Sequence, residues 1–233
     1  MEEFEQSAFL LHSRPYRENQ ILLEFLTSQQ GKISAISYLG KSLKSNKRAL
    51  LQPFSPLKIV LKGQGSLQYL KRVEPERKSY KLSGNYLYSG FYLNELQVRL
   101  LGEHIPYDEL FCQYQQSISQ LSQQHSIELV LRKFENRLLE ELGMTIDYSP
   151  ISYKENSHYS YLPEKGFVPA NFLPTRNKFT QTCYNAIHLK AIAEENISAK
   201  DVMQTYKLLM RQIINHLLDG KPLHSRKLFT QNT

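Results

Sequence analysis

Five short apolar-rich runs occupy the first 80 residues and are separated by residues typical of turns. Arg14-Pro15-Tyr16 is expected to form the first of these turns. A long connection follows the third run, and Pro53 and Pro56 exclude a regular element across its end. Five strands with one long insertion after the third are typical of an OB-fold β-barrel. The strands are predicted at residues 7–13, 21–27, 31–39, 57–61 and 67–73, with the connection at 40–52.

From about residue 84 the apolar positions repeat with the period of an α-helix. The pattern predicts helices that begin near residues 84 and 110, and further helices at residues 126–142, 177–194 and 199–218. Gly143 is expected to end the third of them as a C′ residue. The intervening residues 144–174 are rich in proline and are expected to be irregular. The predicted fold class is therefore α+β and multidomain, with a barrel domain at residues 1–80 and a helical domain at 81–233.

The net charge of +7 is concentrated in the predicted barrel. Residues 1–80 hold 13 Lys and Arg against 7 Asp and Glu, whereas residues 81–233 hold 16 against 15. No acidic residue stands between Phe25 and Val73. A long stretch of one sign favours a polyanionic partner, because each phosphate that is neutralised releases condensed counterions. The cations expected to contact nucleic acid are Arg14, Arg17, Lys32, Lys41, Lys44, Lys47 and Arg48.

Aromatic side chains are interleaved with these cations. Tyr16, Tyr38, Phe54 and Tyr69 fit the stacking platforms on which OB folds hold single strands. Each of them, taken singly, also fits a position in the core, and the sequence does not separate the two roles. Tyr16 and Tyr38 are the residues that we expect to stack on bases.

Motifs for catalysis and for metal binding are incomplete. Gly40-Lys41-Ser42 resembles the end of a P-loop, but that loop requires a glycine where the chain has Ala35. The seven histidines form neither an HExxH motif nor a pair with i, i+4 spacing. We therefore expect a protein without catalytic residues, metal or cofactor. Cys112 and Cys183 are expected to be buried free thiols.

Four segments, in matching order, resemble the RecO family of bacterial recombination mediators. Residues 8–18 resemble the opening strand and turn of that family, and residues 50–57 resemble its LQPF-T/S-PL segment. Residues 87–96 resemble the first helix of its helical domain, and residues 220–229 its closing GKPLxSRxLF segment. In this chain the four segments are AFLLHSRPYRE, LLQPFSPL, LYSGFYLNEL and GKPLHSRKLF.

The resemblance implies a non-enzymatic DNA repair protein of the bacterial cytoplasm and nucleoid. It implies binding to single- and double-stranded DNA and annealing of complementary strands. The implied partners in the RecFOR pathway are the single-stranded-DNA-binding protein SSB, RecR and, indirectly, RecA. Many members of the family carry four cysteines in the irregular stretch, whereas residues 144–174 contain none. The chain thus resembles the zinc-free members, with a degenerate zinc-finger-like insertion.

Two other functions are weighed against DNA repair. An RNA-binding OB-fold protein of translation or ribosome assembly is the alternative that charge leaves open, since charge does not distinguish ribose from deoxyribose. A nuclease would require clustered carboxylates for divalent metal, and the stretch from Phe25 to Val73 offers none. No apolar run approaches the roughly 20 residues of a membrane-spanning helix, so a soluble protein is expected.

The resemblance also implies a site for the tail of SSB, which is acidic and ends in a phenylalanine with a free carboxylate. Arg132, on the helix predicted at residues 126–142, is the expected partner of that carboxylate. Lys133 and Arg137 are expected to attract the acidic residues upstream in the tail. Leu129 and Phe134 are expected to line a pocket for the phenylalanine ring.

Overall fold

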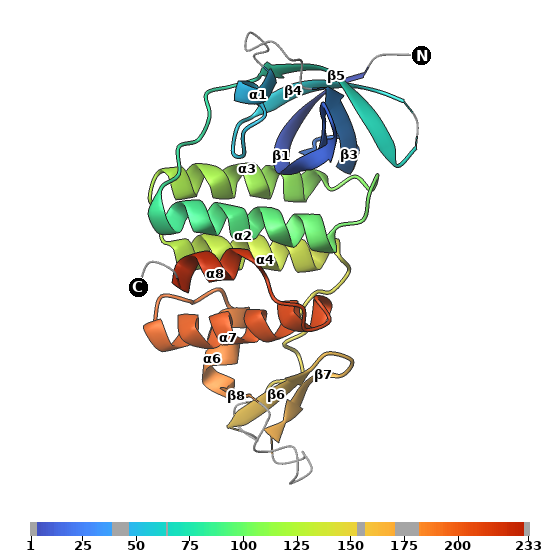
Figure 1. Ribbon diagram of the computed structural model, residues 1–233. Coiled ribbons are helices and arrows are strands. Elements are labelled where there is room, and N and C mark those ends of the chain that lie inside the picture. The colour runs from blue at the N-terminus through green and yellow to red at the C-terminus, as the bar shows by residue number, and fades with distance from the viewer. Residues whose placement is uncertain (1–3, 39–46, 64, 153–156, 171–181, 231–233) are drawn as a thin grey trace. The chain divides into compact units, whose positions relative to one another are not determined.

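The computed structural model describes residues 4–38, 47–63, 65–152, 157–170 and 182–230. The chain divides into two compact units, one made of residues 1–141 with 223–233 and the other of residues 142–222. In the described part of the chain, the first unit contains the β-barrel and five helices, one of which is a single turn, and the second contains a small sheet and two helices (Figure 1). This division falls after residue 141, whereas the domain boundary predicted from the sequence lies after residue 80 and stays a prediction.

Five strands close into a barrel in the order β1-β2-β3-β5-β4. β3 and β5 are parallel, and the other neighbouring strands are antiparallel. The OB-like barrel that the sequence predicts is therefore confirmed. The strands are β1 (Phe4–Arg17), β2 (Gln20–Thr27), β3 (Gly31–Tyr38), β4 (Leu57–Lys62) and β5 (Leu67–Pro75).

Alternating side chains from all five strands fill the barrel interior. Burying one large apolar side chain stabilises the folded state by about 1.5 to 3 kcal/mol. A shift of the strand pairing by one residue would turn all the apolar side chains of a strand outward. The alternation in the sequence therefore fixes the register of the barrel. The interior residues of the strands are Ala8, Leu10, Leu23, Phe25, Ile33, Ala35, Leu57, Ile59, Leu61, Leu70 and Val73.

Two features of the barrel differ from the sequence-based prediction. β1 continues through the expected turn at Pro15 as far as Arg17. Its pairing with β2 shifts between Pro15 and Arg17, and such an irregularity tolerates a residue that lacks an N–H donor. The long connection ends in one helical turn, α1 (Lys47–Leu50), ahead of β4.

Helix α2 (Gly84–Leu100) and helix α3 (Asp108–Ser122) contact strand β1 of the barrel. Asn94 on α2 donates a hydrogen bond to the carbonyl oxygen of Leu11 at 3.0 Å and accepts one from the Tyr114 hydroxyl at 2.6 Å. The Phe9 ring meets the Tyr114 ring edge-on, with centroids 5.1 Å apart. These contacts are buried, so the barrel and α2–α3 share one core.

Helix α4 (Ile127–Glu141) completes this bundle, and helix α8 (Ser225–Thr230) returns the end of the chain to α2. The Glu95 carboxylate accepts hydrogen bonds from the backbone N–H groups of His224 and Ser225, both at 2.8 Å, and from the Ser225 hydroxyl at 2.6 Å. Burial alone would raise the pKa of Glu95, but these bonds outweigh it and lower the pKa. The last helix predicted from the sequence ends at residue 218, so the sequence misses α8.

In its described residues, the second unit holds a three-stranded sheet in the order β7-β6-β8 and two helices. The sequence predicts a helix from residue 177, of which residues 177–181 lie outside the described part of the chain. Residue Tyr184 pairs with Tyr159 in the sheet, and the helix starts only after Asn185, whose side chain accepts a hydrogen bond from the Ile187 N–H at 2.8 Å. The elements are β6 (His158–Leu162), β7 (Gly166–Pro169), β8 (Cys183–Asn185), α6 (Ala186–Ala193) and α7 (Lys200–Leu217).

The two cysteines differ from their predicted environment. Cys112 and Cys183 are free thiols, as expected, but both are exposed, so the predicted burial was wrong. Cys112 follows Phe111 on α3, where the buried stripe continues at Tyr114 rather than at the intervening positions. Among the helices that the structure describes, none is both long and apolar enough to cross a membrane.

Candidate nucleic-acid interface

The outer side of β1, β2, β3 and β5 brings tyrosines and arginines of distant sequence positions into neighbouring rows. Residues paired directly across strands project from the same side of a sheet. We call the surface formed by these rows the open face. Its rows are Arg14, Leu22, Ile36 and Tyr69, and next to them Arg17, Gln20 and Tyr38.

The aromatic residues of the barrel separate into two groups. Tyr38, Tyr69 and Tyr16 are 61%, 50% and 38% exposed, respectively. Phe54 is buried at 4% exposure, with its ring 5.3 Å from that of Phe91. Three of the four interleaved aromatics are therefore available to stack on bases, and the fourth belongs to the core.

Both arginines of the open face are exposed. The structure gives neither Arg14 nor Arg17 an ion pair among the described residues. The guanidinium carbon of Arg17 lies 5.2 Å from the centre of the Tyr16 ring, which is within cation–π range. This stacking holds the guanidinium beside an aromatic plane, in the row that contains Tyr38.

The basic connection before β4 is described only at its end. Lys41 and Lys44 lie outside the described residues. In α1, Arg48 is exposed and Lys47 is half-buried, and no acidic residue belongs to this turn. The phosphate contacts predicted for these four residues stay predictions.

Lys32 lies in a different environment from the other predicted contacts. It is 8% exposed, and its ammonium donates a hydrogen bond to the carbonyl oxygen of Val98 at 2.9 Å. Burial lowers the pKa of Lys32, although the nearby carboxylates of Glu24 and Glu103 partly oppose this effect. This position does not favour a contact between Lys32 and a DNA phosphate.

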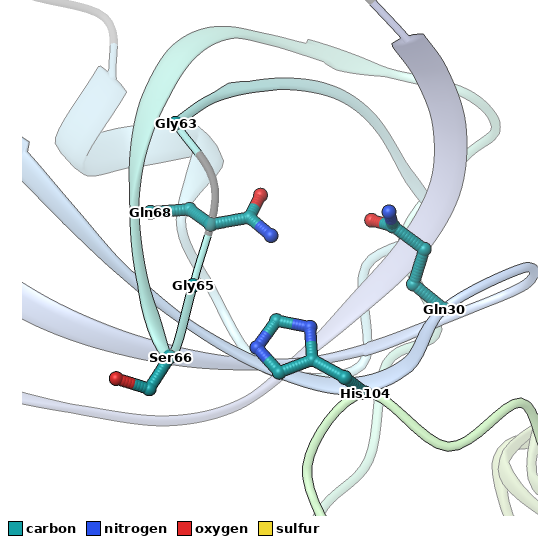
Figure 2. Close-up of a pocket in the computed structure, with 6 residues that line it drawn as sticks. All are labelled: Gln30, Gly63, Gly65, Ser66, Gln68 and His104. Carbon is teal, nitrogen blue, oxygen red and sulfur yellow. The ribbon is translucent and has the colours of Figure 1, made fainter.

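One end of the barrel opens into a pocket of about 380 Å³ that is lined by glycines and polar residues. The amides of Gln30 and Gln68 and the imidazole of His104 point toward its centre (Figure 2). The backbone at Gly63 and Gly65, in the β4–β5 hairpin, forms one wall. Gln68 is buried at 6% exposure, and its side chain has no hydrogen-bond partner among the described residues. We call this site the barrel mouth; its lining residues are Gln30, Gly63, Gly65, Ser66, Gln68 and His104.

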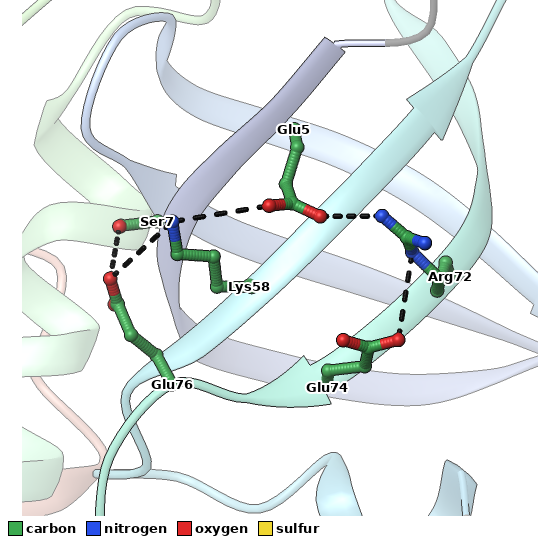
Figure 3. Close-up of polar contacts among 6 residues, drawn as sticks. All are labelled: Glu5, Ser7, Lys58, Arg72, Glu74 and Glu76. Carbon is green, nitrogen blue, oxygen red and sulfur yellow. Dashed lines mark hydrogen bonds and ion pairs between the residues drawn. The ribbon is translucent and has the colours of Figure 1, made fainter.

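A different side of the barrel carries cations that are already paired (Figure 3). The Lys58 ammonium lies 3.9 Å from the Glu5 carboxylate and 4.0 Å from that of Glu76. The Arg72 guanidinium contacts the Glu5 carboxylate at 2.5 Å and that of Glu74 at 3.7 Å. We call this cluster, on β1, β4, β5 and the residue that follows β5, the neutralised side.

The three acidic residues of the neutralised side come from outside the acid-free stretch between Phe25 and Val73. The antiparallel pairing places Glu5 opposite Val60 in β4, beside Lys58. A stretch of one charge in the sequence thus does not become a surface of one charge. The electrostatic attraction for a polyanion is expected to be stronger on the open face than here.

The five residues of helix α4 that are predicted to bind the SSB tail lie in two different environments. Lys133 is exposed, and Leu129 and Arg137 are half-buried. Because residues four apart share a helix face, these three form one surface stripe. Phe134 is fully buried and its ring lies 6.3 Å from that of Tyr114, so it belongs to the core of the bundle.

Arg132 is buried at 6% exposure and forms an ion pair with Glu135. The same carboxylate accepts a hydrogen bond from the Tyr92 hydroxyl at 2.6 Å. Burial raises the pKa of Tyr92, and the neighbouring Glu135 raises it further, so this hydroxyl stays a donor. A carboxylate from another protein would have to compete with Glu135 for the Arg132 guanidinium.

No group of three or more His, Cys, Asp or Glu side chains that could hold a metal ion occurs in the described part of the chain. Because residues 153–156 and 171–181 are outside that part, the absence of zinc stays a prediction. The sequence-based site did not include Lys62, and it named Tyr69 as a possible stacking platform without choosing it. Lys62 in β4 and Tyr69 in β5 are exposed cross-strand partners. Their pairing across a glycine-containing hairpin was the available signal.

Comparisons with known proteins agree over nearly the whole chain. Residues 1–78 match the family described as Recombination protein O N terminal, and residues 82–152 match Recombination protein O C terminal. A DNA repair protein RecO of Coxiella burnetii is 37% identical over 228 residues, which cover 96% of each chain. Those of Pseudoalteromonas atlantica and Cellvibrio japonicus are each 38% identical over 232 residues, covering 97% of this chain and 93% and 96% of theirs.

Proposed function

Because the chain belongs to the RecO family of DNA repair and recombination proteins, we propose that it acts in repair by binding single- and double-stranded DNA on its barrel. The observation that carries this proposal is the open face, where exposed Tyr38 and Tyr69 lie in rows that end in Arg14 and Arg17. Guanidinium groups hold phosphates, and tyrosine rings stack on unpaired bases.

Annealing of complementary strands is part of this proposal and requires no catalytic group. Two strands repel each other through their phosphates, and a cationic surface that holds both reduces the repulsion until bases pair. Arg48 and Lys47 in α1, with Lys41 and Lys44 ahead of them, would extend the cationic surface. The protein would therefore act without turnover, as a binding module of the barrel domain at residues 1–80, in the nucleoid.

The helical residues 81–233 would dock the protein partners, which we propose to be SSB, RecR and, through them, RecA. For the acidic SSB tail, the surface stripe of Leu129, Lys133 and Arg137 offers an apolar contact and two cations, of which Arg137 is paired with Glu140 at 3.0 Å. The double variant Lys133→Glu with Arg137→Glu is expected to lose binding of a peptide that copies the tail, measured by calorimetry. Unchanged peptide binding would move the site elsewhere, with the buried Arg132 as the next candidate.

The DNA proposal is tested by comparing two double variants that each remove two cations. Arg14→Ala with Arg17→Ala removes cations from the open face, and Lys58→Ala with Arg72→Ala removes them from the neutralised side. The affinity for a fluorescent single strand is measured by anisotropy over a range of salt concentrations. If each arginine contacts one phosphate, the log–log salt slope falls by about 0.7 per residue in the first variant.

The second double variant is expected to keep the slope of the unaltered protein, because Lys58 and Arg72 are paired with carboxylates. An equal fall in both variants would mean that DNA does not distinguish the two sides. An unchanged slope in the first variant would remove the open face from the proposal. Repeating the titration with RNA of the same sequence tests the alternative of an RNA-binding function.

A further inference from the structure

The barrel mouth combines burial with hydrogen-bonding capacity that the described residues do not use. Gln6 and Gln68 occupy inward positions, since Gln6 pairs with Ile59 and Gln68 pairs with Ala35, both interior residues. The Gln6 amide donates to the Gln30 side-chain oxygen at 2.8 Å, while its own oxygen is buried without a partner.

The Gln68 side chain is largely buried, but its amide is not among the polar atoms that are closed off without a partner, so solvent or a ligand in the mouth supplies its hydrogen bonds. The donors and the acceptor of Gln68 face the open space of the mouth (Figure 2). The unused groups are therefore available to a ligand.

The lining restricts the chemistry of that ligand. Glycine, serine, glutamine and histidine line the mouth, and no lysine, arginine, aspartate or glutamate is among them. A phosphate or a metal ion would lack a countercharge there. A neutral planar group with donors and acceptors along one edge matches the amide of Gln68, since glutamine can bond such an edge through two atoms at once.

The hairpin beside the mouth connects it to the open face. Lys62 and Tyr69 are cross-strand partners, both exposed, and they flank the turn that holds Gly63 and Gly65. The φ angles of these glycines, 112° and 109°, are ones that other residues rarely adopt, and their missing side chains leave the wall open. A single strand stacked on Tyr69, with a phosphate at Lys62, would reach the mouth with its next base.

We propose that the barrel mouth receives one unstacked nucleobase of single-stranded DNA, which Gln68 reads through its amide and His104 and Gln30 help to enclose. The volume of about 380 Å³ lies within the range of small-ligand sites, and the mouths of β-barrels are a common place for them. The proposal rests on the proposed DNA-binding function. It adds a contact to a base, whereas the open face supplies stacking and phosphate contacts.

The test uses the full chain and two DNA chains of equal length, one with ordinary bases and one made of abasic sites. Gln68→Leu is expected to weaken binding to the base-containing chain about tenfold and to leave binding to the abasic chain unchanged. With 2-aminopurine in the strand, the fluorescence rise that marks an unstacked base is expected to shrink in the variant. Gln97→Leu is the matched control, because Gln97 is also buried but bonds within α2.

Equal affinities of the unaltered protein and Gln68→Leu for the base-containing chain would overturn the inference and leave the proposed function intact. An equal loss on both chains would overturn it as well. Failure of the unaltered protein to bind either chain would instead overturn the proposed function. If Gln68→Leu does not show a cooperative thermal melt, His104→Asn replaces it. Asparagine tolerates the φ of 57° at this position. The variant is then expected to lose about tenfold in affinity for the base-containing chain and none for the abasic chain.

Discussion

The open face and the neutralised side belong to the same small barrel and hold similar numbers of cations, yet they differ in what surrounds those cations. On the open face, Arg14 and Arg17 have tyrosines as neighbours and no carboxylate partner among the described residues. On the neutralised side, Lys58 and Arg72 share the carboxylate of Glu5. The barrel register, rather than the local sequence, decides which cations remain available.

Strand pairing explains why this difference is hidden in the sequence. Arg14 and Tyr69 are far apart in the chain but lie in one row, because β2 and β3 stand between them in register. Glu5 precedes Arg72 by 67 positions and still bonds to it. Binding surfaces on a barrel are therefore properties of cross-strand rows, and a count of charges along the chain misses them.

The largest expected effect comes from removing both exposed rings of the open face, Tyr38→Ala with Tyr69→Ala. Stacking contributes roughly 1 to 3 kcal/mol per base, so the pair is expected to weaken single-strand binding by about 2 to 6 kcal/mol. Duplex binding should change much less, because paired bases are not available for stacking. Anisotropy with single- and double-stranded forms of one sequence measures both, and Tyr38→Phe with Tyr69→Phe is the control that keeps the rings. Equal losses on both forms would contradict a stacking role.

A smaller effect on DNA affinity, of opposite sign, is expected when the neutralised side loses its acidic residues. Glu5→Gln, Glu74→Gln and Glu76→Gln together release Lys58 and Arg72 while preserving side-chain shape. Binding to single strands is expected to become several-fold tighter, and the salt slope steeper by up to about 1.4 if both cations reach phosphates. The pairs are exposed, so each should stabilise the fold by less than about 1 kcal/mol, which urea unfolding would measure. An unchanged slope would show that pairing is not what separates the two sides.

Much of the fold follows from the sequence because its causes are local. The alternation of apolar residues predicted the strands of the barrel. The helical repeat predicted the end of α4, because Gly143, whose φ is 72°, follows it. The misses have non-local causes. Pro15 remains in β1 because of a register shift against β2, and residues 183–185 form a strand because Tyr159 supplies a pairing partner.

The candidate site was predictable in its residue types and less so in its geometry. Tyr16 and Tyr38 were expected to stack, and both are exposed, whereas Phe54, which the same pattern offered as a stacking platform, is buried in the core. Arg132 stands beside Lys133 in the sequence, yet the helix turns Arg132 inward to Glu135 and Lys133 outward to solvent. Neighbours in a helix point about 100° apart, and no charge pattern reveals which one faces the core.

The smallest effect is expected at Lys32, a cation of the barrel that belongs neither to the open face nor to the neutralised side. Its ammonium bonds to the Val98 carbonyl, so Lys32→Met should leave the salt slope of DNA binding unchanged. The charge of Lys32 should instead affect how the free energy of unfolding depends on pH. Because burial lowers the pKa of Lys32 in the folded protein, the unfolded chain binds more protons between that pKa and about 10.5, and stability rises with pH in this window. The unfolding free energy of the unaltered protein should therefore rise relative to Lys32→Met between neutral pH and about pH 10, as measured by urea unfolding. A salt slope that falls by about 0.7 in Lys32→Met would instead mean that this lysine leaves Val98 to hold a phosphate.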